Sequence, residues 1–170
     1  MTEGILLHLV RHGLAAERGE AYPDDSVRPL TPAGIRRMKE EAQGLLALDV
    51  QLDEVLTSPY TRARQTAEII AGAFPRPPRV TNLASLAMGG QPSAVLADLA
   101  RFSKRRALAL VGHEPDIGRL AGRLIGSRHA IPFRKGAVCC IEVAGLPPSG
   151  TGQLQWFLTP RMLRRLGRQG

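Results

Sequence analysis

The chain has 170 residues, of which 44% are hydrophobic and 22% charged, and its formal net charge is +8 at pH 7. This is ordinary globular composition, which excludes collagen-like, disordered and membrane-spanning classes and predicts one domain over residues 1–160. Aromatic residues make up only 4%. That is too few for the stacking platforms of a single-strand binder, so despite the positive charge we expect no nucleic-acid partner.

The basic residues are scattered along the chain, apart from a cluster at its C-terminal end. We expect residues 161–170 to form a solvated basic tail; the alternative is that the positive charge attracts anionic substrates or an acidic partner protein. The N-terminal segment lacks the pattern of a signal peptide, and Cys139 and Cys140 are adjacent, which rules out a disulfide framework. These features predict a cytoplasmic protein that does not associate with membranes.

Segments of strand and helix character alternate along the chain, which predicts an α/β fold with about six strands and four main helices. Two Ser/Thr–Pro pairs, Thr31–Pro32 and Ser58–Pro59, are typical helix starts. Further helices are expected after Pro92, up to about Phe102, and from Pro115. The predicted strands are 5–10, 54–57, 79–82, 107–112, 137–143 and 153–158.

Two histidines follow the two most apolar strands. His12 lies in Arg-His-Gly after the first strand, and His113 lies in Gly-His-Glu-Pro after the strand 107–112. Ligands of open α/β sheets bind at the carboxyl ends of strands, so both imidazoles are expected in one crevice. The segment 58–66 starts a helix after another strand, with Arg62 near its N-terminus. Two histidines, Arg11, Arg62 and a helix end that favours anions predict a site for a dianionic phosphate.

A neutral imidazole is a good nucleophile near pH 7 and can take up a phosphoryl group as covalent phosphohistidine. Guanidinium groups can stabilise the charge of the transferring group, so the reaction requires no metal. We find no group of His, Cys, Asp and Glu with convincing ligand spacing. The sequence therefore predicts neither a metal site nor another cofactor. His8, inside the first strand, is expected to be a packed histidine.

Four motifs in order, 9–13, 30–34, 58–67 and 111–113, resemble the histidine phosphatase superfamily, whose fold is called phosphoglycerate mutase-like. The short chain and the segments 25–31 and 112–116 resemble its SixA-type phosphohistidine phosphatase branch. The resemblance implies a three-layer α/β/α sandwich with a mostly parallel central sheet. It also implies roles for five residues: His12 as the nucleophile, Arg11, Arg62 and His113 as ligands of the phosphoryl group, and Arg28 as a phosphate or substrate contact.

The sequence departs from the wider superfamily in one respect. Larger members carry a Glu or Asp proton donor in the stretch that corresponds to 83–92, and here that stretch has no carboxylate. Glu114, Asp116, Asp24 and Asp25 are local substitutes, and the residues do not choose among them or require any. We assign none of them as catalytic.

The resemblance predicts a metal-independent phosphatase that acts through a phosphohistidine intermediate, with phosphohistidine in a partner protein as its substrate. Two alternatives stay open. The same chemistry could serve small phosphorylated metabolites, or the chain could be a non-catalytic module that binds phosphate. The enzyme is expected to be monomeric.

Overall fold

One six-stranded sheet organises the fold, with the strand order β3-β2-β4-β1-β5-β6. The computed structural model describes residues 4–169. Strands β3, β2, β4 and β1 run parallel, whereas β5 is antiparallel to both of its neighbours, β1 and β6. The prediction of a mostly parallel sheet of about six strands is confirmed. The strands are β1 (Ile5–Arg11), β2 (Glu54–Thr57), β3 (Arg79–Asn82), β4 (Ala107–Gly112), β5 (Val138–Val143) and β6 (Gln153–Leu158).

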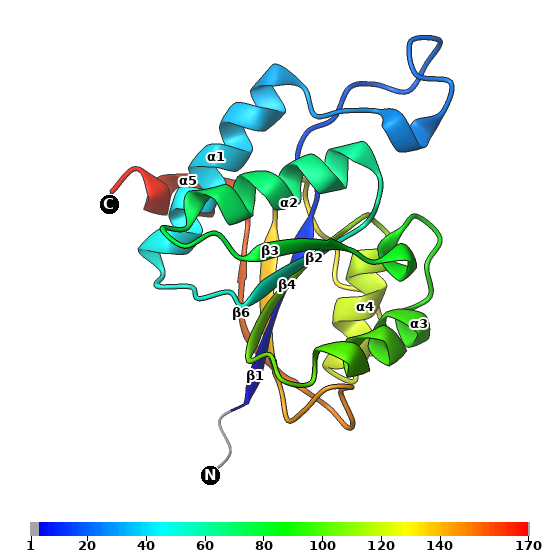
Figure 1. Cartoon of the computed structure of the whole chain (residues 1–170), viewed down its shortest axis with the longest axis vertical. Helices are drawn as coiled ribbons and strands as arrows, with labels where there is room; N and C mark the ends of the chain where they lie inside the picture. The colour runs from blue at the N-terminus through cyan, green and yellow to red at the C-terminus, as the bar shows by residue number, and fades with distance from the viewer. Residues whose placement is uncertain (1–3, 170) are drawn as a thin grey trace.

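Helices cover both faces of this sheet, which gives the expected three layers (Figure 1). Side chains alternate along β1, so that Leu7 and Leu9 join the core under α3 and α4, while Val10 joins the core under α1, α2 and α5. The helices are α1 (Pro32–Ala47), α2 (Thr61–Ala73), α3 (Pro92–Asp98), α4 (Asp116–Leu124) and α5 (Pro160–Gly167), with 3₁₀ turns at η1 (Asp25–Val27), η2 (Ala84–Leu86) and η3 (Leu99–Phe102). No helix within residues 4–169 is long and apolar enough to cross a membrane.

The first two helices begin with different chemistry, although both follow a Ser/Thr–Pro pair. Thr31 caps α1 as predicted, because its hydroxyl oxygen accepts a hydrogen bond from the Gly34 amide at 2.9 Å. The prediction that α2 opens at Ser58–Pro59 is wrong, since that helix starts at Thr61. The Ser58 hydroxyl contacts a histidine ring instead of capping the helix.

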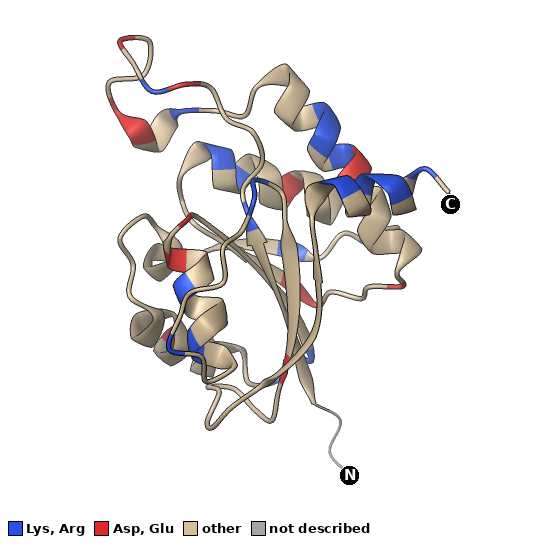
Figure 2. Ribbon diagram, turned by 180° about the vertical axis from the view of Figure 1, so that it is seen from behind, with Lys and Arg blue, Asp and Glu red and all other residues tan. Residues whose placement is uncertain are grey.

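The prediction of a solvated basic tail over 161–170 is also wrong. Residues Pro160–Gly167 form helix α5, which packs along α1, and its Leu163 is fully buried. Two of the basic side chains are ion-paired: Arg164 with Glu41 and Arg168 with Glu40. Figure 2 shows the basic segments of α5 beside the acidic segment of α1. The sequence did hold the signal, because Thr159–Pro160 repeats the Thr–Pro start of α1.

The packing of α5 gives a test on stability. Leu163→Ala removes a fully buried side chain and should lower the free energy of unfolding by about 2–5 kcal/mol. Met162→Ala, on the same helix but 50% exposed, should change it by less than about 0.5 kcal/mol. Urea denaturation measures both values. Equal, small effects of the two variants would mean that α5 does not pack on the domain.

Candidate active site

The pairing of β1 with β4 brings the two predicted histidines together. The strands are parallel neighbours, and Arg11 lies opposite Gly112 at the end of the ladder. His12 and His113 therefore emerge at the same edge of the sheet, and the His12 amide donates to the Gly112 carbonyl at 3.1 Å. Their ring centroids are 5.1 Å apart. The expectation that both imidazoles lie in one crevice matches this placement.

The hydrogen bonds of His12 fix which ring nitrogen carries the proton. Nδ1 lies 2.8 Å from the Gly13 carbonyl oxygen, which can only accept, so Nδ1 is protonated. Nε2 is then the bare nitrogen, and it accepts a hydrogen bond from Nε of Arg62 at 3.3 Å. The lone pair of His12 thus faces the arginine that the motifs single out.

Arg62 reaches His12 from the first turn of α2, and its side chain is only 1% exposed. Thr66, one helical turn further on, ties this turn to the loop of the nucleophile. Its hydroxyl donates to the Arg62 carbonyl at 2.8 Å and accepts from the Gly13 amide at 3.1 Å. The spacing of four residues on one helix face was the signal for Thr66, which the sequence analysis did not single out.

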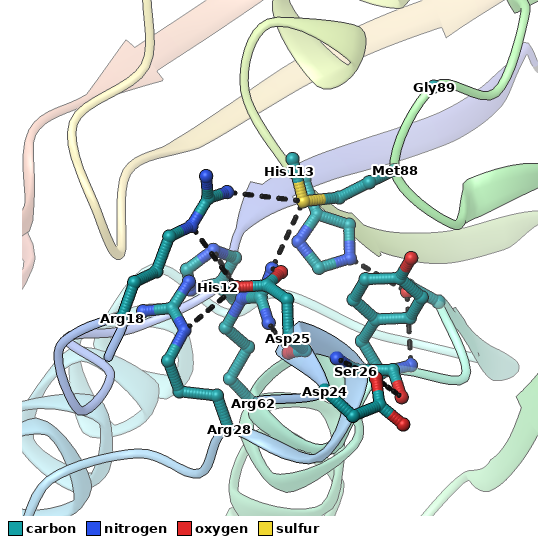
Figure 3. A network of polar contacts seen from close by, with 12 residues as sticks. His12, Arg18, Asp24, Asp25, Ser26, Arg28, Arg62, Met88, Gly89 and His113 are labelled. Carbon is teal, nitrogen blue, oxygen red and sulfur yellow. Dashed lines mark hydrogen bonds and ion pairs between the residues drawn. The ribbon is translucent and has the colours of Figure 1, made fainter. Parts of the chain in front are cut away.

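His113 is oriented by Ser58, the residue that does not cap α2. Its Nε2 lies 2.7 Å from the Ser58 hydroxyl, which in turn accepts a hydrogen bond from the Tyr60 amide. The other ring nitrogen, Nδ1, is buried, has no hydrogen-bond partner, and points toward His12 in Figure 3. If Ser58 donates to Nε2, Nδ1–H becomes a free donor in the site.

Arg11 is held by the loop between α4 and β5. Its Nη1 donates to the Phe133 carbonyl at 2.7 Å, and the amide of Phe133 donates to the Glu114 carboxylate. One residue thus joins the arginine to the carboxylate that follows His113. Glu114 thereby positions the loop on which the Arg11 side chain is fastened.

Arg28, expected as a phosphate or substrate contact, lies beside the same cavity. It is buried, and its Nε donates to Asp25 Oδ1 at 3.0 Å, while Nη1 donates to the Ala16 carbonyl. Asp25 also pairs with Arg18 and Arg62 (Figure 3). Arg28 is thus held beside the cavity by a carboxylate that the sequence analysis named only as a candidate proton donor.

All five predicted site residues line one cavity of about 370 Å³. The sequence analysis missed Lys135, which also lines it; burial lowers the pKa of this amine, and the charges of Arg11, Arg28 and Arg62 act in the same direction. A larger hollow of about 540 Å³ between α1 and α2 is lined by neither histidine nor arginine. We therefore place the candidate site in the smaller, strongly positive cavity.

Both histidines of the site are neutral at physiological pH. Burial, together with the charges of His113, Arg62 and Arg11, lowers the pKa of His12 to about 3. Burial and the charge of Arg62 lower the pKa of His113 to about 3 as well. A bare imidazole nitrogen beside three guanidinium groups can attack an electrophilic centre that carries negative charge, and a phosphoryl group is such a centre.

The four candidate proton donors occupy different places. The carboxylate of Asp24 binds Ser26 on an exposed turn, and that of Asp116 accepts from the Gly89 amide at 2.7 Å. Hydrogen bonds and charges of Arg62 and Arg28 outweigh burial and hold the pKa of Asp25 below its usual range. Only Glu114 combines a place in the cavity lining with a pKa raised by burial. Within residues 4–169, no group of three or more His, Cys, Asp or Glu side chains could hold a metal ion.

Comparison with known proteins agrees with the motifs. The model of the histidine phosphatase superfamily (branch 1) matches residues 7–89. An uncharacterized protein of Picosynechococcus sp. is 46% identical over 118 residues, which cover 68% of this chain and 70% of that protein. The phosphohistidine phosphatase SixA of Escherichia coli K12 is 29% identical over 158 residues, or 92% of this chain and 94% of SixA. The chain belongs to the histidine phosphatase superfamily.

Within the superfamily, the chain is a homologue of SixA in sequence and in structure. The structure of the protein histidine phosphatase SixA complexed with tungstate superposes with a TM-score of 0.83 at 28% identity. The match covers 94% of this chain and 99% of that one. The resemblance to the SixA-type branch is thus confirmed.

The buried histidines predict a loss of stability in acid. A histidine whose folded pKa lies below the unfolded value of ~6.5 stabilises the fold fully above that value, and this contribution is lost as the pH falls below it. Glu41 acts in the opposite sense, since burial raises its pKa to about 7. The observable is therefore the difference in slope between variants.

Between pH 6.5 and 5, His113→Gln should flatten the dependence of the unfolding free energy on pH by about 1 kcal/mol per pH unit relative to the wild type. Urea denaturation at several pH values measures both slopes. A wild-type slope in His113→Gln would show that His113 takes up a proton as easily in the folded chain as in the unfolded one.

Proposed function

We propose that this protein is a phosphatase that transfers the phosphoryl group of its substrate to Nε2 of His12 and then to water. The observation that carries the proposal is the bare Nε2 of a neutral, buried His12, which faces Arg62 in a cavity also lined by Arg11, Arg28 and His113. The similarity to the phosphohistidine phosphatase SixA supports it.

The mechanism follows from the positions of these groups. The His12 lone pair attacks phosphorus, a P–N bond forms, and the bond to the leaving group breaks on the opposite side. Arg62, Arg11 and the Nδ1–H of His113 would donate to the oxygens of the transferring group as negative charge builds up on them. Water then attacks phosphorus, the P–N bond to His12 breaks, and inorganic phosphate leaves with His12 again neutral.

We further propose phosphohistidine in a protein as the substrate. Expulsion of an alkoxide requires a proton donor, because its conjugate acid is about as weak as water, with a pKa of ~16. The stretch 83–92 contains no carboxylate. A phosphohistidine ring can instead take up a proton near neutral pH and leave as neutral imidazole. The chemistry of the site therefore favours phosphoramidates over alkyl phosphates.

We infer a cytoplasmic monomer as the working form of the enzyme. Both cysteines are free and buried, which suits a reducing compartment. Among the described residues, the large apolar side chains that are exposed are few: Val27, Leu48, Leu154 and Met162. Sedimentation in the presence of reductant measures the oligomeric state.

The proposal predicts a covalent adduct on His12. Brief mixing with a ³²P-labelled phosphoramidate should label the wild-type chain with an acid-labile, base-stable group, and His12→Ala should carry no label and have no activity. Exhaustive chelation should leave the rate unchanged. Label on a serine or an aspartate, or full activity in His12→Ala, would contradict the assignment.

A matched pair of arginines on α2 supplies the control. Arg62→Ala removes a donor to the transferring group and should lower kcat by about 10²–10³. Arg64→Ala should leave kcat near the wild-type value, because Arg64 pairs with Glu68 and Asn82 on the surface. Equal losses in the two variants would mean that the cavity is misplaced.

The lack of a carboxylate in 83–92 predicts a steep dependence on the leaving group. Across phosphate esters of graded leaving-group pKa, log(kcat/KM) should fall as that pKa rises, with phosphoramidate well ahead of any alkyl ester. General acid catalysis usually contributes ~10²–10⁴, which sets the scale of the difference. A flat series for the wild type would show that a proton donor is present. If Glu114→Gln then gave a steep series, that donor would be Glu114.

A further inference from the structure

Asp25 places a carboxylate among the arginines of the cavity. Its Oδ1 pairs with Nε of Arg18 at 3.1 Å and with Nε of Arg28 at 3.0 Å. Its Oδ2 accepts from Nη2 of Arg62 at 2.8 Å. Figure 3 shows this carboxylate between the three guanidinium groups, beside His12. No other carboxylate described in residues 4–169 pairs with more than one of these arginines.

All three nitrogens of the Arg62 guanidinium group donate hydrogen bonds in this structure. Nη1 donates to the backbone carbonyl of Asp25 at 2.7 Å, and Nη2 is shared between the Asp25 carboxylate and the sulfur of Met88. Nε donates to the lone pair of His12. A phosphoryl group at His12 Nε2 needs these donors for its own oxygens, so it cannot bind Arg62 fully while Asp25 stays in place.

The charges favour an exchange of anions. Asp25 brings one negative charge to Arg18, Arg28 and Arg62, which together carry three positive charges. A phosphoryl dianion can supply two negative charges to the same guanidinium groups, with bidentate geometry. The carboxylate also lies within electrostatic reach of the second histidine: burial and Arg62 lower the pKa of His113, and the charge of Asp25 opposes them.

The segment that carries Asp25 is suited to move. Asp25 begins the short turn η1, and residues 17–21 before it are exposed. The base of the loop is anchored on both sides, by the bridge between Ala15 and Leu30 and by the hydrogen bond from the Leu30 amide to Gln65. An outward shift of η1 would break the hydrogen bonds from Arg62 to Asp25 and leave the base of the loop in place.

We propose that Asp25 is an internal anion that occupies the phosphoryl position of the free enzyme and is displaced when the phosphoryl group of the substrate binds. This inference rests on the proposed function, since it assigns the ligand that Asp25 replaces. An anion then pairs with Arg18, Arg28 and Arg62 in both states: Asp25 in the free enzyme and the phosphoryl group in the complex. The consequence is a free enzyme whose affinity for oxyanions is lowered by its own carboxylate.

The opposite role makes the opposite prediction. If Asp25 served only to position Arg62 and Arg28 for the substrate, its removal would weaken the binding of oxyanions. If it competes with them, its removal strengthens their binding. Asp25→Asn keeps the size of the side chain and one acceptor oxygen but removes its charge. Asp24→Asn changes the net charge equally at the next residue, whose carboxylate contacts Ser26 and no arginine.

The experiment is isothermal titration with tungstate, a tetrahedral dianion, and perrhenate, a tetrahedral monoanion, at fixed ionic strength. Asp25→Asn should bind tungstate at least ten times more tightly than the wild type, and Asp24→Asn should bind within twofold of it. If the ligand displaces Asp25, the gain in affinity should be the same for perrhenate as for tungstate. The reason is that the carboxylate has left the three arginines in either complex. Asp25→Ser repeats the test if Asp25→Asn does not fold.

Two results would overturn the inference alone: unchanged or weaker binding of tungstate by Asp25→Asn, or a gain for tungstate that far exceeds the gain for perrhenate. The second result would mean that Asp25 stays in place and repels ligands in proportion to their charge. If the wild type and both Asp25 variants bind no tungstate, the cavity is not an oxyanion site, and the proposed function fails with the inference.

Discussion

The parallel pairing of β1 with β4 is the interaction on which the candidate site depends. It aligns the ends of two strands that are about 100 residues apart in sequence, so that His12 and His113 leave the sheet side by side. The other groups of the cavity lie around these two histidines. Arg62 arrives from the start of α2, and Arg11 is the last residue of β1 itself. Because β1 and β4 are central strands with apolar side chains on both faces, the hydrophobic effect that forms the sheet also fixes the distance between the histidines.

The electrostatics of the cavity combine two effects that work in the same direction. Burial disfavours a charged imidazole, and the surrounding guanidinium groups disfavour it further, so both rings stay neutral. The same guanidinium groups make the cavity attractive to anions. The requirements of a nucleophilic nitrogen and of an anion-binding site therefore agree. The positive charge that attracts a phosphoryl group also keeps the His12 lone pair free of a proton. Only a hydrogen bond from Arg62 covers that lone pair.

The sequence predicted what depends on local patterns and missed what depends on tertiary contacts. Strands β2, β3, β4 and β6 have the predicted bounds, because each is a short run between clear breaks. The site histidines were found because they follow strands. Helix α5 was missed although its Thr–Pro start could be read, since a high density of arginine suggested a solvated segment, and its pairing with Glu41 and Glu40 is visible only in the fold. Lys135 lines the cavity from a loop, and Asp25 contacts the arginines of the cavity from the short turn η1. No periodicity in the sequence records the path of such segments.

Asp25 and Glu114, the acidic groups near the histidines, differ in whether they can donate a proton, and this difference bears on the choice of substrate. Asp25 is held ionised by the arginines that contact it, so it supplies charge and no proton. Burial raises the pKa of Glu114, but one of its oxygens accepts a hydrogen bond from the amide of Phe133, whose carbonyl accepts from Arg11. A site that stabilises charge strongly and donates protons weakly lowers the barrier most for leaving groups that depart without help. An N–P bond to a protonated imidazole has such a leaving group, and an alkyl ester does not. For the proposed phosphatase, the arrangement of carboxylates therefore favours a substrate by the type of bond that is broken, independently of the shape of the molecule that carries it.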